Sequence, residues 1–257
     1  MRNLKLAALA IALAQGCITA PVGFYETAFP SNTRFYAGMA VEEGRNYEDI
    51  PDDTGKFSYA EPSEIVSLIW LSYSPVPKLS VGLERTNSGD MQGGMRAKLS
   101  LLNNNKVAVA AVCRGGLSWG SYGGMVWPVL LSYCEDTTIY RLYNLSAAGI
   151  LSYSLLGDWK RGVGRFPVRL SLNAGPKALL ARLDYTRIKE SYYEDTVYSD
   201  TCRFLGNIHD YGWFLGANAE ISIFTIAWEM TFLSAESPLR RERAWARFWG
   251  VSVGGTF

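Results

Sequence analysis

A strict alternation of apolar and polar residues recurs along most of this chain, and it limits the fold more than any other feature of the sequence. In residues 34–42 every second position is apolar or small: Phe35, Ala37, Met39 and Val41. The same period marks residues 79–83, 95–101, 107–113 and 224–232. A period of two residues places alternate side chains on opposite faces of a β-strand. Few segments show the period of a helix, so the sequence predicts an all-β fold.

Turn-forming residues divide the alternating segments into antiparallel strands. Residues 137–156 could form one very long strand or two shorter ones. If both chain ends lie on one side, the number of strands must be even, and we expect about twelve, with ten to fourteen compatible with the pattern. Short connections are expected at residues 74–78, 103–105 and 220–222, and long ones at residues 44–63, 115–124, 186–210 and 234–243.

The amino-terminal residues have the composition of an export signal. Arg2 and Lys5 precede an apolar run over residues 6–14 that is too short to span a bilayer as a helix. Two cleavage sites remain open. Ordinary signal peptidase would cut after Ala14, whereas the sequence before Cys17 resembles a bacterial lipobox and would make that cysteine a lipid attachment site.

The export signal sets the expected division of the chain. We predict that residues 1–16 form the signal peptide, residues 17–32 a periplasmic tether and residues 33–257 the β-domain. No later segment approaches the ~18 consecutive apolar residues of a membrane helix. Any part that spans a membrane must therefore be a closed β-barrel, because a barrel satisfies every backbone polar group in lipid.

Composition argues against several classes of function. The formal net charge is +1 and the calculated pI is about 7.6, so bulk electrostatics do not favour binding to nucleic acid. The four cysteines match no zinc-binding spacing, and we expect no cofactor and no metal. They are Cys17, Cys113, Cys134 and Cys202.

Charged residues in the middle of the strands bear on which face of the sheet is wet. In a soluble β-sandwich they would form a solvated face, whereas in a narrow barrel they would point into the lumen and pair with one another. Short connections that alternate with long ones favour the barrel. The lumen-facing charges are expected to be Glu84, Arg96, Lys98, Arg114, Arg169, Arg182, Asp184 and Glu229.

The carboxyl-terminal segment carries a resemblance to a known class. Trp249, Val251, Val253 and Phe257 alternate with small or polar residues up to the last position of the sequence. In this respect the chain resembles bacterial outer-membrane β-barrel proteins, whose last strand ends on an aromatic residue, usually Phe, that the assembly machinery reads as an insertion signal.

The resemblance extends over residues 33–257 and identifies a class, not a narrower family. It implies a transmembrane barrel in the bacterial outer membrane, in contact with outer-membrane lipid and lipopolysaccharide and recognised by the barrel-assembly machinery. The final strand is then expected to close the barrel by pairing with the strand that begins at Thr33.

The sequence carries no recognisable catalytic arrangement, and we expect a protein that is not an enzyme. Its one histidine, His209, is followed by Asp210 and Tyr211, so the His-x-Ser pair of the outer-membrane phospholipase and the lipid A deacylase is missing. The Asp-x-His pair of omptin-type proteases is also missing, because position 207 is Asn. The acidic pair Asp52–Asp53 lies in a Pro- and Gly-rich segment typical of solvated turns.

Three functions fit these observations. The first is a narrow pore for small solutes or a plugged structural barrel, since about twelve strands enclose a narrow lumen. The second is an exported soluble β-sandwich lipoprotein that binds a ligand or partner. The third is a surface adhesin that acts through a tyrosine-rich segment, although the same tyrosines could simply belong to two strands extending above the membrane; these residues are Tyr192, Tyr193 and Tyr198.

Overall fold

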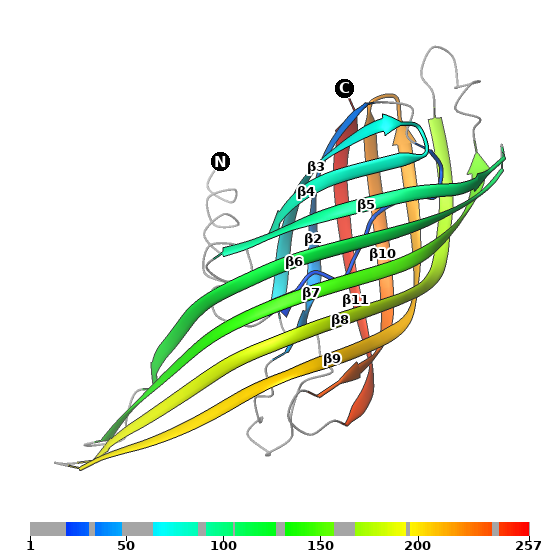
Figure 1. Ribbon diagram of the computed structural model, residues 1–257. Helices are drawn as coiled ribbons and strands as arrows, with labels where there is room; N and C mark the ends of the chain where they lie inside the picture. Colours follow the sequence, from blue (N-terminus) through cyan, green and yellow to red (C-terminus); the bar gives the residue numbers. More distant parts are fainter. Residues whose placement is uncertain are drawn as a thin grey trace.

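The computed structural model of this chain shows an antiparallel β-sheet that curls round and closes on itself (Figure 1). The structure describes residues 19–30, 34–47, 64–86, 91–104, 106–126, 132–156, 168–193, 196–237 and 242–256. Within these ranges no helix is long and apolar enough to cross a membrane.

Eleven strands are present in the described residues, and ten of them, β2 to β11, form the closed barrel. Each pairs with the next along the chain, and β2 pairs with both β3 and β11, which closes the ring. The strands are β1 (Thr19–Ala20), β2 (Phe35–Asn46), β3 (Glu64–Val76), β4 (Leu79–Thr86), β5 (Met91–Asn103), β6 (Val107–Val126), β7 (Ser132–Leu156), β8 (Val168–Tyr193), β9 (Thr196–Ile221), β10 (Phe224–Glu236) and β11 (Arg243–Thr256).

The barrel therefore has ten strands where we expected about twelve. The difference arises because residues 132–156 form one strand, β7, and because β8 runs without interruption through Gly175 and Pro176. Pro176 pairs with Trp213 on β9 and has no pairing partner on β7 within the described sheet, where its missing N–H breaks no hydrogen bond. Gly175 is required there, since a Cβ would overlap the carbonyl oxygen of Gly149.

Two segments expected to be long connections are also strands. Residues 115–124 lie within β6, and residues 186–210 belong to β8 and β9 except for Glu194 and Asp195, which lie outside the described residues. The expected short connections are confirmed at Pro77–Lys78 and at Ser222–Ile223. The expected closing pair is confirmed as well, because β11 pairs with β2 from Gly250 to Thr256.

The outer face of the barrel is apolar and its inner face is polar or small. Leu83 and Met95, which pair across β4 and β5, are 64% and 65% exposed on the outside. Their strand neighbours Glu84 and Arg96 are buried inside. A closed sheet with this distribution has the architecture of outer-membrane β-barrels, in which lipid covers the apolar face.

One apolar row faces the opposite way from our expectation. In β8, Leu179, Ala181, Leu183 and Tyr185 are buried on the inside, so Arg182 is exposed on the outer face and Asp184 is partly exposed there. The reason is the continuity of the strand. Apolar residues occupy even positions from Val168 to Ala174 and odd positions afterwards, and a single strand cannot turn both rows outward.

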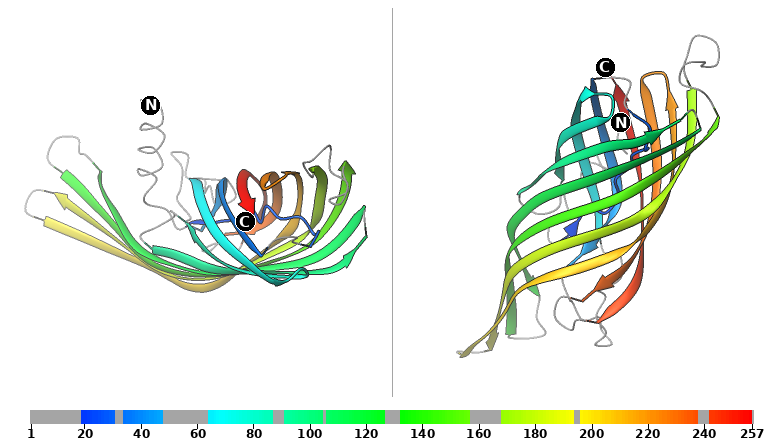
Figure 2. Two further views of the ribbon diagram at one scale, coloured as in Figure 1. Left: turned by 90° about the horizontal axis from the view of Figure 1, so that it is seen from above. Right: turned by 45° about the vertical axis from the view of Figure 1, so that its right-hand side comes forward.

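The two ends of the barrel differ (Figure 2). At one end lie Thr256 and the tight connections of β3–β4, β5–β6 and β9–β10, and we call it the C-terminal end. The connection between Leu156 and Val168 is the longer one there. At the other end β6 to β9 extend well beyond the remaining strands, toward the lower left of Figure 1, and we call it the projecting end.

The chain between β1 and β2 runs through the inside of the barrel, where Figure 1 shows it as a thin blue trace. Residues 20–30, which we call the luminal segment, have buried apolar side chains and many hydrogen bonds to the inner face of the barrel. This corrects our prediction that residues 17–32 form a periplasmic tether, at least for residues 19–30, which the structure describes.

Candidate functional site: the occupied lumen

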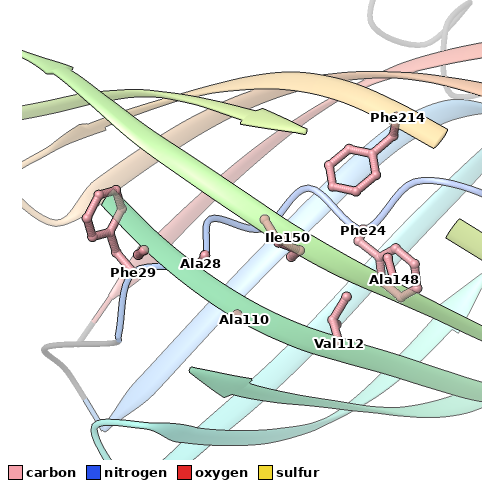
Figure 3. Close-up of a cluster of buried hydrophobic side chains, with 9 residues drawn as sticks. Phe24, Ala28, Phe29, Ala110, Val112, Ala148, Ile150 and Phe214 are labelled. Carbon is pink, nitrogen blue, oxygen red and sulfur yellow. The ribbon is translucent and has the colours of Figure 1, made fainter. Parts of the chain in front are cut away.

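Aromatic side chains anchor the luminal segment in the barrel. Phe24 and Phe29 are completely or almost completely buried and pack in one cluster with side chains from the surrounding strands, as Figure 3 shows. The segment thus replaces water at the centre of the barrel, and burial of its apolar surface stabilises this position. The strand members of the cluster are Ala108, Ala110, Val112, Ala148, Ile150 and Phe214.

Two buried carboxylates hold the backbone of the first part of the segment. Glu42 on β2 accepts hydrogen bonds from the N–H groups of Val22 (2.5 Å) and Gly23 (3.1 Å). Glu229 on β10 accepts hydrogen bonds from the N–H of Phe24 (3.1 Å) and of the residue that follows it (2.9 Å). Four consecutive backbone donors are therefore satisfied by charged side chains of the barrel wall, and such charge-assisted bonds are stronger than neutral ones.

Arg114 on β6 binds the same part of the segment through its carbonyl groups. Its Nη2 donates to the carbonyl oxygen of Gly23 at 2.7 Å, and its Nη1 donates to that of Pro21 at 3.3 Å. The guanidinium also pairs with Glu84 at 2.8 Å and lies 5.0 Å from the centre of the Phe24 ring. Because Arg114 is 1% exposed, these partners are what make its burial tolerable.

Lys177 on β8 binds the same part of the luminal segment as Arg114 does. Its ammonium pairs with Glu229 at 2.5 Å and donates to Thr231 at 2.9 Å and to the carbonyl of Val22 at 2.8 Å. The same ammonium lies 4.9 Å from the centre of the Phe24 ring. Lys177 and Glu229 therefore neutralise each other while both bind the luminal segment.

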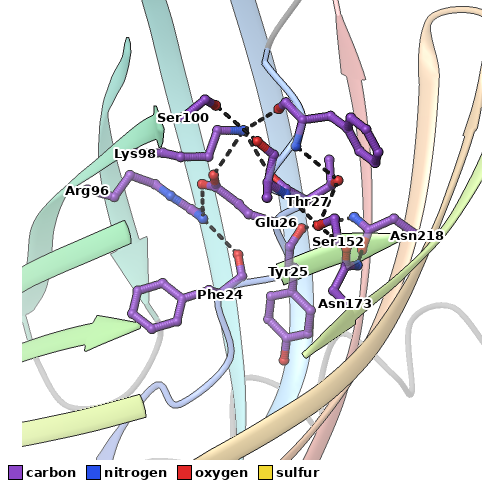
Figure 4. A network of polar contacts seen from close by, with 12 residues as sticks. Phe24, Tyr25, Glu26, Thr27, Arg96, Lys98, Ser100, Ser152, Asn173 and Asn218 are labelled. Carbon is purple, nitrogen blue, oxygen red and sulfur yellow. Dashed lines mark hydrogen bonds and ion pairs between the residues drawn. The ribbon is translucent and has the colours of Figure 1, made fainter. Parts of the chain in front are cut away.

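A second group of charges holds the middle of the segment (Figure 4). Arg96 on β5 pairs with Glu26 of the segment at 2.5 Å and donates to the carbonyl of Phe24 at 2.7 Å. Lys98, two residues along the same strand, pairs with Glu26 at 3.4 Å and donates to the carbonyl of Thr27 at 3.2 Å. Glu26 is thus a charge carried by the segment itself, with two basic partners on the barrel wall.

Neutral side chains complete the contacts on the opposite wall, also visible in Figure 4. The hydroxyl of Ser152 accepts a hydrogen bond from the N–H of Ala28 at 2.7 Å and donates to Asn173 at 2.6 Å. Asn173 donates to Asn218 at 2.5 Å, and Asn218 donates to the carbonyl of Tyr25 at 3.4 Å. This chain of amides and hydroxyls links three long strands to the segment.

Tyr25 of the luminal segment has a backbone conformation that a bulky residue seldom adopts. Its φ is 56°, in the left-handed region. Glu229 binds its N–H, and Glu42 accepts its hydroxyl hydrogen bond. Such a conformation persists where the surroundings fix it from several sides, and here two carboxylates on different strands do so.

The luminal segment does not fill the lumen completely. A cavity of about 90 Å³ lies toward the C-terminal end, large enough for several water molecules. Its lining combines apolar surface, including that of Phe29, with groups of both charges, Glu26, Lys98 and Glu220, and with several serine and threonine hydroxyls.

A buried ion pair lies where the segment meets the projecting end. Arg45 and Asp210 are 0% and 1% exposed, with Nε and carboxylate oxygen 2.8 Å apart. Arg45 also donates to the carbonyl oxygen of Glu236 at 2.7 Å, and the backbone N–H of Glu236 donates to Asp210 at 2.8 Å. The pair joins β2, β9 and β10 at the point where β1 pairs with β2, since Arg45 is itself paired with Ala20.

The structure brings together most of the charges expected in the lumen. Arg182 and Asp184 do not belong to this set, because they lie on the outer face, where Asp184 pairs with the exposed Arg203 at 3.6 Å. The residues inside are Glu84, Arg96, Lys98, Arg114, Arg169 and Glu229.

Sequence reasoning missed several members of the site. Glu42 lies on the polar face of β2, and its alternation with apolar residues was sufficient to predict that it faces the lumen. Lys177 directly follows Gly175 and Pro176, which have the composition of a turn, and there no local pattern assigns it to a face of a strand. Glu26 lies outside any alternating segment, so the sequence pattern could not identify it.

The other predicted residues are only partly described. Trp249, Val251 and Val253 lie on the outer face of β11. Phe257 and Cys17 lie outside the described residues. The backbone at Tyr192, Tyr193 and Tyr198 is strand, which agrees with the view that two strands extend beyond the barrel.

The described residues contain no group of three or more His, Cys, Asp and Glu side chains that could hold a metal ion. His209 lies exposed on the outer face of β9. Cys113 is free and exposed on the outer face of β6. What the site contains is a dense set of hydrogen bonds and ion pairs that hold a polypeptide segment inside the barrel.

Comparison with known proteins gives fold-level similarity only. No protein-family model and no curated protein sequence matches the chain. Among solved structures, LpxR from Salmonella typhimurium is 7% identical with a TM-score of 0.30, covering 86% of this chain and all of that one. The CymD monoaromatic hydrocarbon channel is 9% identical with a TM-score of 0.28, covering 88% and 89%. A bacterial polysaccharide outer membrane secretin is 8% identical with a TM-score of 0.25, covering 88% and 99%. Similarity at this level assigns none of their functions to this chain.

Proposed function

We propose that this protein is a non-enzymatic channel of the bacterial outer membrane whose lumen is closed by its own luminal segment. The observation that carries the proposal is the density of polar contacts between the segment and the barrel wall. From Pro21 to Ala28, backbone N–H and C=O groups are bound by side chains of seven strands, β2 and β5 to β10.

The distribution of exposed apolar side chains supports the membrane over the soluble alternative. Large apolar residues are exposed on every strand from β2 to β11, among them Ile69, Leu145 and Ile226, each at least 50% exposed. Soluble monomers seldom expose an apolar surface that continues around the whole molecule. A bilayer covers such a surface and leaves the charged interior as the only polar path through it.

The charges of the barrel wall favour a channel over a barrel that is only structural. If the luminal segment moved away, the wall would present Glu42, Glu229, Lys177 and Arg114 to the lumen. Water can solvate these groups, and the emptied space would be a polar passage suited to small solutes. An interior that served only to fill the barrel would gain more from well-packed apolar side chains than from buried ions.

Conductance in planar lipid bilayers tests the proposal. The wild-type protein is expected to be closed for most of the recording. A variant with Phe24→Gly and Tyr25→Gly loses two of the three buried aromatic side chains of the segment, keeps Phe29 and leaves the barrel wall unchanged, so we expect frequent or sustained current steps. Ser118→Ala is the matched control, because Ser118 is buried on β6 and its hydroxyl has no hydrogen-bond partner in the described residues.

Each outcome bears on the proposal. Steady current through the wild-type protein would contradict the closed state. If the double variant folds, as shown by a heat-dependent shift on gels, and conducts no more than the wild type, the protein is a structural barrel and not a channel. Release of the protein from membranes by carbonate without detergent would contradict the membrane location itself.

A further inference from the structure

The luminal segment has a fixed direction inside the barrel. Its first residue, Ala20, and the preceding Thr19 pair with Arg45 and Asn46 at the far end of β2. Its last residues lead to Phe35, where β2 begins at the C-terminal end. The described chain therefore starts at the projecting end and crosses the lumen to the C-terminal end, where Pro30 lies near Thr256 and β2 begins.

The order of the side-chain contacts gives the same direction independently. Along β5, which runs toward the C-terminal end, the first of three inward-facing residues binds an early carbonyl group of the segment and the next two bind later ones, so the two run in parallel. Arg96 binds the carbonyl of Phe24, whereas Lys98 binds those of Thr27 and Phe29 and Ser100 binds that of Ala28. On β2, which runs the opposite way, Glu42 near the far end binds Val22.

Because the luminal segment crosses the barrel, the first and last described residues lie at opposite ends of it. In a barrel with an even number of strands, the first and last strands begin and end on the same side, here the C-terminal end. The luminal segment crosses the lumen between Thr19 and the start of β2, so Thr19 lies at the end of the barrel opposite to the start of β2. Thr256 and Thr19 are consequently at opposite ends of the barrel.

The shape of the two ends indicates which one faces outward. Outer-membrane barrels have short turns on the periplasmic side and longer connections or extensions on the outer side. The C-terminal end has three tight connections, and the projecting end has the extended β6 to β9 together with the long connection between Asn46 and Glu64. The projecting end is therefore assigned to the cell surface.

We propose that Thr19, at the amino-terminal side of the luminal segment, lies at the cell-surface end of the barrel, while the start of β2 and the end of β11 lie at the periplasmic end. This proposal rests on the proposed membrane location. The direction of the luminal segment limits how it can leave the lumen. Since the segment is joined to β2 at the C-terminal end, it can leave freely only toward that end. A bulky group attached before Thr19 holds the plug in place from outside.

Accessibility of an inserted tag tests the proposal in intact cells. An epitope with a protease site is inserted between Ile18 and Thr19, which keeps it in the chain after either expected signal cleavage. The matched control carries the same insertion between Pro77 and Lys78, in the tight β3–β4 connection at the C-terminal end. Site-specific protease and antibody are added to cells before and after the outer membrane is permeabilised.

We expect the Ile18–Thr19 tag to be cut and labelled in intact cells, and the Pro77–Lys78 tag only after permeabilisation. Exposure of both tags on the same side would overturn the threading. Exposure of the Pro77–Lys78 tag alone in intact cells would overturn the assignment of the projecting end to the surface. A heat-dependent gel shift and the membrane fractionation of each tagged protein are measured separately, so failure to form a membrane barrel is distinguished from both results.

Binding of the antibody to the Ile18–Thr19 tag tests the functional consequence on the same protein. In bilayers, antibody added on the side of the projecting end is expected to reduce current steps of the Phe24→Gly/Tyr25→Gly variant by at least half. Antibody on the other side is expected to have no effect. An equal effect from both sides, or none from either, would contradict a plug held from the outside.

Discussion

The ammonium of Lys177 lies 2.5 Å from a carboxylate oxygen of Glu229, and each of the two also binds the luminal segment. Both side chains are buried, at 3% and 4% exposure. The ion pair thus joins two strands of the barrel wall and also binds the luminal segment. Its loss therefore affects both the stability of the wall and the position of the segment.

Removal of one partner of this pair is expected to destabilise the barrel strongly. Glu229→Ala leaves Lys177 as an uncompensated buried charge, which costs about 3–5 kcal/mol. The double variant Lys177→Met/Glu229→Gln removes both charges and is expected to recover most of that loss. Equilibrium unfolding in urea, with the protein in lipid vesicles, measures the difference.

The exposed pair of Asp184 and Arg203 is the control for this prediction. It has the same types of charge on neighbouring strands, but its side chains are 34% and 65% exposed. Asp184→Ala is expected to change the free energy of unfolding by about 0–1 kcal/mol. Equal effects at the two sites would contradict a buried, functional pair in the lumen.

A charge placed on the outer face distinguishes a membrane barrel from a soluble one. Leu83 is exposed in the middle of β4, and Leu83→Arg is expected to cost about 2–4 kcal/mol in lipid because the charge must enter the bilayer. Val76→Arg, next to the β3–β4 connection, should cost about 0–1 kcal/mol, since it lies near the interface. In a soluble protein both changes would be neutral, and unfolding in vesicles would then show no difference between them.

Close approach of strands makes one glycine essential to the barrel. A Cβ on Gly212 of β9 would overlap the carbonyl oxygen of Phe232 on β10. Gly212→Val is therefore expected to reduce the folded fraction at least several-fold, as measured by the heat-dependent shift on gels. Gly93→Val is the control, because a Cβ there would meet its nearest atom at 3.9 Å. Similar losses for both variants would show that the close approach is not what matters.

The last residue is expected to act in assembly and not in stability. Deletion of Phe257 should lower the amount of folded protein in membranes, because the resemblance to outer-membrane barrels makes this residue the insertion signal. Phe35→Ala is the control, since Phe35 is an outward-facing aromatic residue at the C-terminal end. Normal amounts of the truncated protein in the membrane, compared with the control, would refute the role of Phe257.

Local alternation predicted much of the fold. The rows from Phe35 to Val41, at Val81 and Leu83, and from Phe224 to Trp228 face outward as expected, and the closing pair of β2 with β11 was also anticipated. Strand number was overestimated, because Gly175 and Pro176 have the composition of a turn. A local pattern cannot show that two neighbouring strands accommodate a proline and a close backbone approach at that point.

By itself the sequence determined that this chain alternates, that its strands have two unlike faces and that its ending matches outer-membrane barrels. The tertiary structure decided that the lumen is occupied, and by which residues. The segment from Val22 to Phe29 has no periodic pattern, and its partners are as distant in the chain as Glu229. Its position depends on charges that meet only after ten strands have closed around it, so no local signal in the sequence could place it there.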